Sequence, residues 1–189
     1  NDLRKTYSLG ESTLVGIDGR IERYKGHEDL ILGVSLLSKE DQAKIKLVFI
    51  GPGDEDEIER LQRIKNNVNL TNDLLFTGYI PGAPQEIIAQ LDMLAVVSKN
   101  FEGFGLTLAE AMSVGVPVLA TNIGGIPEFI HEDVGTLVPP ESPDQVAERI
   151  TDFIKFPKKF QLKAEKAKLH IRKYSGKKMA RKFHQLFMI

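Results

Sequence analysis

Cysteine is absent from the chain of 189 residues. This absence excludes disulfide bonds and cysteine-ligated zinc, and it is compatible with a reducing cytosol. No apolar run approaches the roughly 18 residues that a membrane-spanning helix needs, and no signal peptide is visible. We therefore expect a cytoplasmic protein. Its length fits one ordinary domain with a proper core, or one domain with appended helices.

An initiator methionine, internal repeats and low-complexity segments are also lacking. Because the chain begins with Asn1 and opens polar, we interpret it as an excised piece or a processed product of a longer protein. The only plausible linker is the first dozen residues. The histidines His27, His131, His170 and His184 show no spacing typical of metal ligands, and the sequence predicts no metal site.

A net charge of −1 hides a strong asymmetry along the chain. Residues 151–189 hold twelve Lys or Arg and two acids, whereas the remainder holds 13 basic and 24 acidic residues. The basic tail is either a pair of solvated helices or a patch that contacts an anionic membrane surface or an acidic partner. Nucleic acid is disfavoured as a partner because no aromatic platform is interleaved with these charges.

Short apolar runs alternate with helical patterns along the chain. The runs are β-branched or aliphatic nearly throughout, which is typical of strands that are covered on both faces of a parallel sheet. The runs are Ser12–Asp18, Lys46–Gly51, Leu74–Gly78, Met93–Ser98, Pro117–Thr121 and Gly135–Pro139. Helical patterns cover about 27–38, 55–66, 84–91, 105–115 and 143–155, and two more follow at 157–173 and 176–187.

This alternation predicts an α/β fold, a Rossmann-like doubly wound parallel sheet of about six strands with two extra C-terminal helices. We expect one domain over 1–189. It divides into a leader or linker (1–12), an α/β core (13–155) and basic C-terminal helices (156–189). In such a sheet, ligands bind in the crevice at the carboxyl ends of the strands.

The stretch after the first strand, GRIERYKG, places Arg20 and Lys25 around a short turn before a helix. Two cations beside a helix start suit a diphosphate, because fixed charge adds to unpaired backbone N–H groups. Exposed basic side chains near a loop often only face solvent, and Arg23 competes with Arg20 for the role. His27, close by, is expected to be a helix-start residue rather than an acid or base.

Three other strand ends carry weaker signals. The D-x-D triplet Asp54–Asp56 could hold a metal-bound nucleotide, but we favour an interpretation in which Asp54 caps a helix with acids in its first turn. Gly78 lets the backbone approach a ligand or turn sharply, and a flat base could rest on that proline-stiffened loop. Glu128 is expected to have a structural role.

The segment EGFGLTLAEAMSVG places two acids, Glu102 and Glu110, among apolar residues. The helix that it contains is apolar nearly all round and should be buried. An ionised carboxylate there costs several kcal/mol unless it is paired. Glu110 therefore needs a backbone N–H, a cation or ligand hydroxyls, and the residues alone leave open whether it serves a ligand or only local backbone groups.

Glu102 lies in the loop before this helix, between a serine-containing strand end and two glycines. Gly103 and Gly105 let the main chain come close to a bound molecule. The amides of Leu106 and Thr107 would point from the first helical turn toward an anion. The two carboxylates could thus reach two separate polar parts of one elongated ligand.

Taken in order, the stretches GRIERYKG, VFIGPG, LLFTGYIP, EGFGLTLAEAMSVGVPVLATNIGGIPE and VGTLVPP resemble the C-terminal half of the group 1, family 4 glycosyltransferases. These are two-domain enzymes of the GT-B architecture. The resemblance covers about residues 13–187, and its E-x7-E element, followed by G-x-P-V and G-G-x-x-E, is quite specific. The tail KYSGKKMARKFHQLF is similar to the family's closing helix.

This resemblance implies a role for each matching residue. Arg20 and Lys25 would neutralise the diphosphate of a sugar nucleotide, Glu110 would accept the ribose hydroxyls, and Glu102 would hold hydroxyls of the transferred sugar. The implied catalytic residues are Glu102, Arg20 and Lys25. The implied donor-binding residues are Arg20, Lys25, Gly78, Tyr79, Glu102, Gly103, Phe104, Gly105, Leu106, Thr107 and Glu110.

The resemblance further implies a hexosyltransferase that moves a sugar from a nucleoside diphosphate sugar to a glycan or lipid-linked saccharide in polysaccharide biosynthesis. Transfer would retain the anomeric configuration and need no metal or other cofactor. Preorganised cations and helix dipoles would stabilise the departing diphosphate. The family's N-terminal acceptor domain is absent here, so we expect the chain alone to bind donor weakly and transfer little or nothing.

Other functions remain as alternatives. A GT-B sugar-nucleotide epimerase or a phosphorylase is one class, although no segment suggests the pyridoxal lysine of a phosphorylase. A non-catalytic nucleotide-binding module is another, against which the intact Arg20, Lys25, Glu102 and Glu110 argue. The basic tail would bring the protein to the inner face of the membrane if the membrane interpretation holds.

Overall fold

The computed structural model describes residues 2–187 and contains one parallel sheet. Its strands are β1 (Thr13–Asp18), β2 (Ile45–Ile50), β3 (Leu74–Gly78), β4 (Met93–Val96), β5 (Val118–Thr121) and β6 (Thr136–Val138). They lie in the order β3-β2-β1-β4-β5-β6, and every recorded pairing between them is parallel. The predicted six-stranded doubly wound sheet is therefore confirmed.

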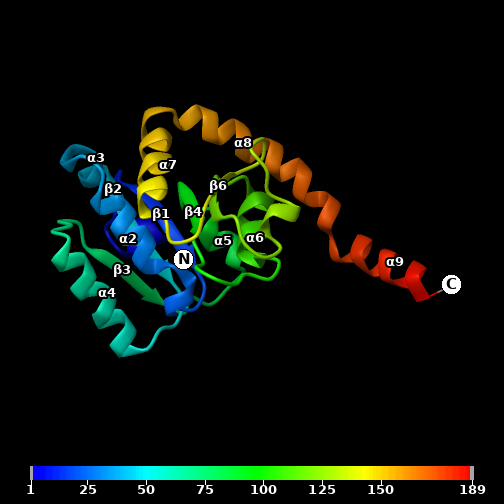
Figure 1. Ribbon diagram of the computed structural model, residues 1–189, viewed down its shortest axis with the longest axis horizontal. Helices are drawn as coiled ribbons and strands as arrows, with labels where there is room; N and C mark the ends of the chain where they lie inside the picture. Colours follow the sequence, from blue (N-terminus) through cyan, green and yellow to red (C-terminus); the bar gives the residue numbers. More distant parts are fainter. Residues whose placement is uncertain (1, 188–189) are drawn as a thin grey trace.

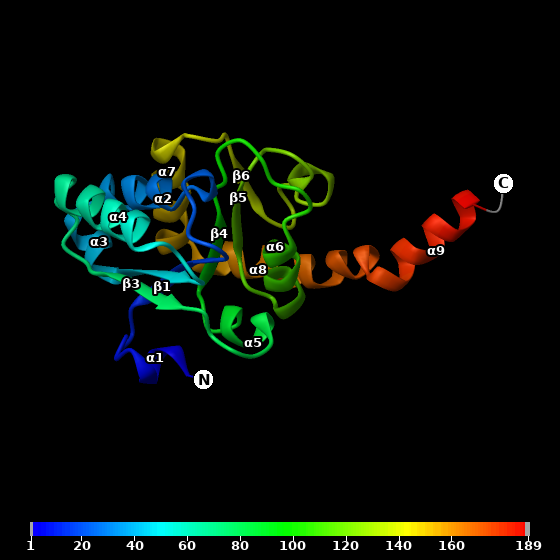
Figure 2. The ribbon, with the colours of Figure 1, turned by 90° about the horizontal axis from the view of Figure 1, so that it is seen from below.

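Helices cover both faces of this sheet (Figures 1 and 2). The helices of the described residues are α1 (Leu3–Thr6), α2 (His27–Ser35), α3 (Lys39–Lys44), α4 (Glu55–Asn67), α5 (Pro84–Ile88), α6 (Leu106–Val114), α7 (Pro143–Lys155), α8 (Pro157–His170) and α9 (Gly176–Phe187), of which α9 does not lie on the sheet. Figure 2 shows α2, α4 and α7 on one side of the sheet and α5 on the other.

The strand sequences explain this two-sided burial. Successive side chains of a strand point to opposite faces. In β1, Leu14 therefore joins the core beneath α5 and α6, whereas Val15 and Ile17 join the core beneath α2, α4 and α7. Each face is filled by aliphatic side chains, and this is why the strands lack a polar–apolar alternation.

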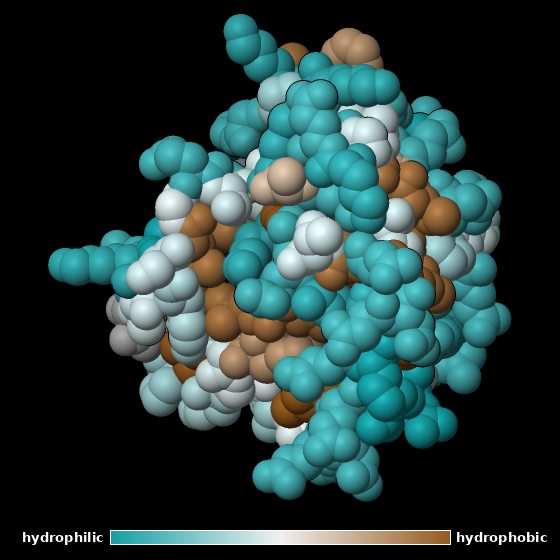
Figure 3. Space-filling model, turned by 90° about the vertical axis from the view of Figure 1, so that its left-hand side faces the viewer, coloured by the Kyte–Doolittle hydropathy of each residue, from teal (hydrophilic) through white to brown (hydrophobic). Residues whose placement is uncertain are grey.

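The edge of the sheet at β3 is less enclosed, since every residue of that strand is only partly buried. Figure 3 shows the side of the molecule that carries α3, α4 and this edge. Hydrophilic residues dominate that face and surround a smaller hydrophobic area.

Two short helices differ from the sequence-based expectation. The helix expected over 27–38 ends at Ser35, and α3 follows it as a separate element. Ser38 separates the two helices because its side chain accepts a hydrogen bond from the Asp41 amide and caps α3. The helix expected over 84–91 likewise ends at Ile88.

The segment expected as a leader or linker contains α1, which packs on the domain. Leu3 is buried, its amide donates to the Gln90 side chain at 2.7 Å, and Arg4 forms a 2.8 Å ion pair with Asp92. Asp92 also accepts from the Leu14 amide. The first residues of the described chain are thus tied to the amino-terminal ends of β1 and β4.

The chain changes direction in the sheet at β1 and β4. Helix α2 follows β1 on one face and α6 follows β4 on the other, so the loops after these neighbouring strands diverge. Such a topological switch point opens a crevice at the carboxyl ends of the strands. The loop after β1 fits against β4 because Gly26, at φ 75°, has no Cβ; one built there would lie 1.9 Å from the Val97 carbonyl oxygen.

The C-terminal helices behave as two different parts. Helix α8 packs against α6 and α7, and the turn Ile171–Tyr174 leads into α9, which projects from the body (Figures 1 and 2). None of the described residues of α9 is buried. Within residues 2–187, no helix combines the length and apolar character needed to cross a membrane.

Candidate functional site

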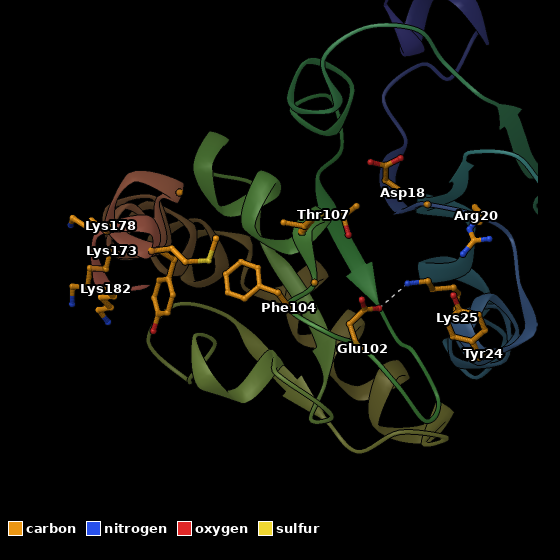
Figure 4. Close-up of a pocket in the computed structure, with 16 residues that line it drawn as sticks. Asp18, Arg20, Tyr24, Lys25, Glu102, Phe104, Thr107, Lys173, Lys178 and Lys182 are labelled. Atoms are coloured by element: carbon orange, nitrogen blue, oxygen red, sulfur yellow. Dashed lines mark hydrogen bonds and ion pairs between the residues drawn. The ribbon is translucent and has the colours of Figure 1, made fainter. Parts of the chain in front are cut away.

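A cavity of about 780 Å³ lies at the switch point, where the loops after β1 and β4 diverge. Its walls come from the end of β1, the turn after it, the loop before α6 with the first turn of that helix, and the start of α9 (Figure 4). Of the donor-binding residues expected from the sequence, the lining includes Arg20, Lys25, Glu102, Phe104, Gly105, Leu106 and Thr107.

The Lys25 ammonium and the Glu102 carboxylate meet across this cavity at 2.8 Å. Only 24% and 13% of these side chains are exposed, so the pair is largely withdrawn from water. The Ser98 hydroxyl also donates to Glu102 at 3.0 Å. Two charged groups that the sequence places far apart thus pair in one wall of the cavity (Figure 4).

Arg20 and Arg23 occupy different positions. Arg20 lines the cavity, is 69% exposed and pairs with Glu22 at 2.9 Å. Arg23 is 80% exposed and pairs with Glu57 at 3.4 Å, outside the cavity. Because a surface ion pair is weak, Arg20 is free to exchange Glu22 for an anion in the cavity.

Helix α6 begins at Leu106 and presents its amino-terminal end to the cavity. Gly105 enters the helix at φ 72°, and no side chain caps that end. The first amides of an α-helix have no acceptor within the helix, and the helix dipole is positive there. The amides of Leu106 and Thr107 therefore favour a bound anion at this end.

Two glycines after β5, Gly124 and Gly125, contact the backbone of the Glu102 loop and hold it in place. The Gly125 amide donates to the carbonyl oxygens of Glu102 and Gly103 at 3.2 and 3.0 Å. A Cβ at Gly124 would lie 1.9 Å from the Glu102 carbonyl oxygen. The two glycines after β5 thus allow the loops after β4 and β5 to contact one another through their backbones. Gly103, which was expected to bind the donor, takes part in this contact and does not line the cavity.

Gly78, Tyr79 and Glu110 also lie outside the lining of the cavity. Gly78 ends β3 at φ 65°, and its carbonyl oxygen accepts from the Gly51 amide at 2.9 Å. Tyr79 is 74% exposed. Glu110, on α6, receives a long 3.4 Å hydrogen bond from the Gln85 side chain, and burial raises the pKa of its carboxyl.

Asp18 is a lining residue that the sequence analysis did not single out. It is the last residue of β1, and burial, with the nearby Glu110 charge, raises the pKa of its carboxyl to about 6. The available signal was an acid that ends an otherwise apolar strand. It was overlooked because the following Arg20 and Lys25 carry the recognisable pattern.

The wall opposite Lys25 comes from the chain end and was also missed. This wall contains Lys173, Tyr174, Gly176, Lys178, Met179 and Lys182. Tyr24 also lines the cavity, but on the side of Lys25. Figure 4 shows the three lysines on the far side of Phe104 from Lys25.

Aromatic contacts connect this far wall to the Glu102 loop. The Phe104 ring stacks on Phe129 with centroids 4.6 Å apart, and Tyr174 lies 6.0 and 5.9 Å from the two rings. The Tyr174 hydroxyl donates to the Glu128 carbonyl oxygen at 3.0 Å. Glu128 thus contributes its backbone to the support of this wall and does not line the cavity.

Two other sequence-based interpretations concern structural residues. His27 begins α2 as expected, is 2% exposed and meets Phe49 edge-on, and burial lowers its pKa to about 4. Asp54 stands at the N-cap position of α4, but its side chain makes no capping hydrogen bond. Over residues 2–187, the His, Asp and Glu side chains form no group of three or more that could hold a metal ion.

Comparison with known proteins connects this geometry to a family. The family described as glycosyl transferases group 1 matches residues 2–171. The chain is 32% identical over 155 residues to N-acetyl-alpha-D-glucosaminyl L-malate synthase of Bacillus anthracis, covering 81% of this chain and 39% of that protein. It is 30% identical over 164 residues to the GDP-mannose-dependent alpha-(1-6)-phosphatidylinositol monomannoside mannosyltransferase of Mycobacterium tuberculosis, covering 81% and 41%.

Solved structures have the same fold. HepE of Anabaena, crystallised with UDP-glucose, matches with a TM-score of 0.81 and 25% identity over 89% of this chain and 46% of that chain. The C-terminal domain of a group 1 glycosyl transferase, LpcC of Francisella tularensis, matches with a TM-score of 0.78 and 26% identity over 93% and 94%. The chain thus spans less than half of the length of these curated relatives, and it covers 94% of the solved C-terminal domain of LpcC.

Proposed function

Because the chain belongs to the group 1 glycosyl transferases, we propose that it is the donor-binding half of a retaining, metal-independent hexosyltransferase. The donor is a nucleoside diphosphate sugar, and the acceptor is a glycan or a lipid-linked saccharide. The observation that carries this proposal is the meeting of Lys25, Glu102 and the amino-terminal end of α6 in one cavity at the switch point of the sheet.

The cations and the helix end form the diphosphate site in this proposal. During transfer, the bond between the sugar anomeric carbon and the diphosphate oxygen breaks, and the electron pair stays on the diphosphate. The acceptor hydroxyl oxygen forms the new bond to that carbon and gives its proton to the departing diphosphate. Lys25 and the amides at the start of α6 stabilise the growing charge on the diphosphate, because they are fixed in place before the reaction begins. Arg20 adds to them once it has exchanged Glu22 for the diphosphate. A partly buried ammonium serves this purpose better than a fully hydrated one.

The carboxylates orient the two polyol ends of the donor. Glu102 accepts from hydroxyls of the transferred sugar beside the diphosphate, and Glu110 accepts from ribose hydroxyls farther along α6. The Lys25–Glu102 ion pair keeps both side chains in the cavity before donor arrives. The backbone at Gly78–Tyr79 meets the base.

The chain supplies only part of an enzyme of this kind. The curated relatives extend well beyond the matched region, which is 39% of one and 41% of another. We infer that the acceptor is bound by a further domain, so that this chain alone binds donor weakly and transfers almost nothing.

Calorimetric titration of the chain with UDP, GDP and ADP tests the proposal. We expect saturable binding of at least one nucleoside diphosphate, with a dissociation constant of about 0.1–1 mM, as suits a site completed by another domain. Failure of all three to bind at millimolar concentration contradicts the proposal and favours a module that keeps the fold without donor chemistry.

We further propose that α9 contacts an anionic membrane at its inner face. Its sequence places Phe183 and Leu186, which do not line the cavity, on one side of the helix, each at least 54% exposed, and basic residues on the other. A helix with this arrangement suits the plane of a bilayer interface.

A further inference from the structure

Asp18 is a carboxylate without a partner in the wall of the cavity. Over residues 2–187, no ion pair or hydrogen bond of its side chain is found, although the residue is only partly exposed. A carboxylate that is withdrawn from water in this way destabilises the unliganded protein. Its position at the end of β1 places it on the cavity rather than in the core.

The cations near Asp18 are engaged elsewhere. Lys25 is bound to Glu102 at 2.8 Å and Arg20 to Glu22 at 2.9 Å. In Figure 4, Asp18 lies at the end of β1, apart from the Lys25–Glu102 pair, and Thr107 at the start of α6 lies across from it. Helix α6 also carries Glu110, whose charge acts on Asp18.

We propose that Asp18 is a donor-binding residue that, together with Glu110, holds the ribose hydroxyls of the nucleotide. This inference depends on the proposed donor-binding function. It assigns a second carboxyl to the nucleoside portion of the site, on the strand side, opposite the carboxyl on α6.

The charge distribution in the cavity favours hydroxyls as the partner of Asp18. A carboxylate repels phosphate, and the diphosphate already has Lys25, Arg20 and the start of α6. Hydroxyl groups can donate to both carboxylates, and a ribose presents two neighbouring hydroxyls. Burial raises the pKa of Asp18 only to about 6, so at neutral pH its carboxyl is mostly ionised and accepts these hydrogen bonds.

The test compares Asp18→Ala with the unchanged chain, using the nucleoside diphosphate that binds best and its 2′,3′-dideoxy analogue. We expect Asp18→Ala to weaken the ribonucleotide about tenfold and the dideoxy analogue less than about twofold. Asp54→Ala is the matched control, because Asp54 also follows a strand but does not line the cavity. Asp54→Ala should change neither the affinity for the ribonucleotide nor the affinity for the dideoxy analogue.

Asp18→Asn provides a second, nearly isosteric variant in case the alanine variant does not fold. We expect it to weaken the ribonucleotide about threefold, because a neutral amide replaces a charged acceptor. If the affinities for the ribonucleotide and the dideoxy analogue fall equally, or if neither variant loses affinity, the role of Asp18 is refuted. The proposed donor-binding function is then unaffected. If the unchanged chain binds no nucleoside diphosphate, the proposed function itself fails.

Discussion

At the scale of single residues, Glu102 and Glu110 have different surroundings and should respond differently to removal. Glu102 is paired with Lys25, whereas Glu110 has only a long bond from Gln85. We expect Glu110→Ala to weaken nucleoside diphosphate binding about tenfold. Glu102→Ala should leave that affinity within about twofold and lower transfer by the full-length enzyme about 100-fold.

The measurements are nucleotide titration of this chain and initial rates of the full-length enzyme. Glu128→Ala is the control, because that acid lies outside the cavity and supports Tyr174 through its backbone alone. Equal losses of nucleotide affinity from the two substitutions would contradict the division of roles.

Lys25→Ala should act on phosphate rather than on the nucleoside. We expect the affinity for a nucleoside diphosphate to fall about 10-fold to 100-fold, since a partly buried charge-assisted contact is lost. The affinity for the free nucleoside should fall less than about threefold. Arg23→Ala is the control, because that side chain lies outside the cavity. A loss for the nucleoside as large as that for the diphosphate would refute the phosphate assignment.

His27 gives the fold a specific sensitivity to acid. Burial lowers its pKa from 6.5 to about 4, so the unfolded chain binds more protons between these values. The contribution of neutral His27 to the free energy of unfolding is therefore fully present above pH 6.5. It decreases as the pH falls toward 4, by up to about 3 kcal/mol. His27→Leu should remove this part of the slope in urea unfolding measured between pH 7 and 4.5. An unchanged slope would show that other groups that titrate in this range, such as Asp18, dominate.

At the scale of elements, the contact between the loops after β4 and β5 depends on Gly124. The residue has φ 54°, and a Cβ there would lie 1.9 Å from the Glu102 carbonyl oxygen. Gly124→Ala must therefore displace the Glu102 loop, and we expect a loss of about 3 kcal/mol with weaker donor binding.

Gly10→Ala is a matched control for this substitution, because Gly10 has φ 56° and nothing lies within 4 Å of its Cβ position. It should cost about 1 kcal/mol from backbone strain alone and leave donor binding unchanged. Thermal melting and nucleotide titration of both variants make the comparison. Equal melting temperatures would argue against the loop contact.

Elements with long apolar patterns were predicted well, and short polar ones were not. The strands, α7 and α8 lie where periodicity placed them, because burial on two faces or one stripe leaves a strong pattern. Helix α9 has no buried residue, but its apolar side chains recur with the same helical period. Helix α3 escaped because six mostly charged residues show no such pattern, and only the Ser38 cap marks it. At the site, the sequence did not predict Tyr174 and Met179 as lining residues. The turn after α8 brings them to the cavity, and their neighbours in the sequence carry no pattern that marks a site.

At the scale of the whole molecule, the basic residues are concentrated in the C-terminal helices and the body is acidic. We therefore expect α9 to bind membranes that carry negative charge and not neutral ones. We expect the chain to sediment with vesicles that contain phosphatidylserine and not with neutral vesicles. Leu186→Ser should weaken this binding about tenfold, because the residue is 67% exposed and free to enter the interface. Leu162→Ser, on α8 and 66% exposed, is the matched control. No sedimentation with anionic vesicles would contradict the membrane proposal.

The aromatic contacts between Phe104, Phe129 and Tyr174 connect the start of the projecting helix α9 to the loop that carries Glu102. Tyr174 ends the turn from which α9 extends, and Phe104 lies two residues from Glu102. A partner that binds α9 would therefore act, through three neighbouring rings, on the loop that carries Glu102. We expect binding at α9 to change the position of the Glu102 carboxylate.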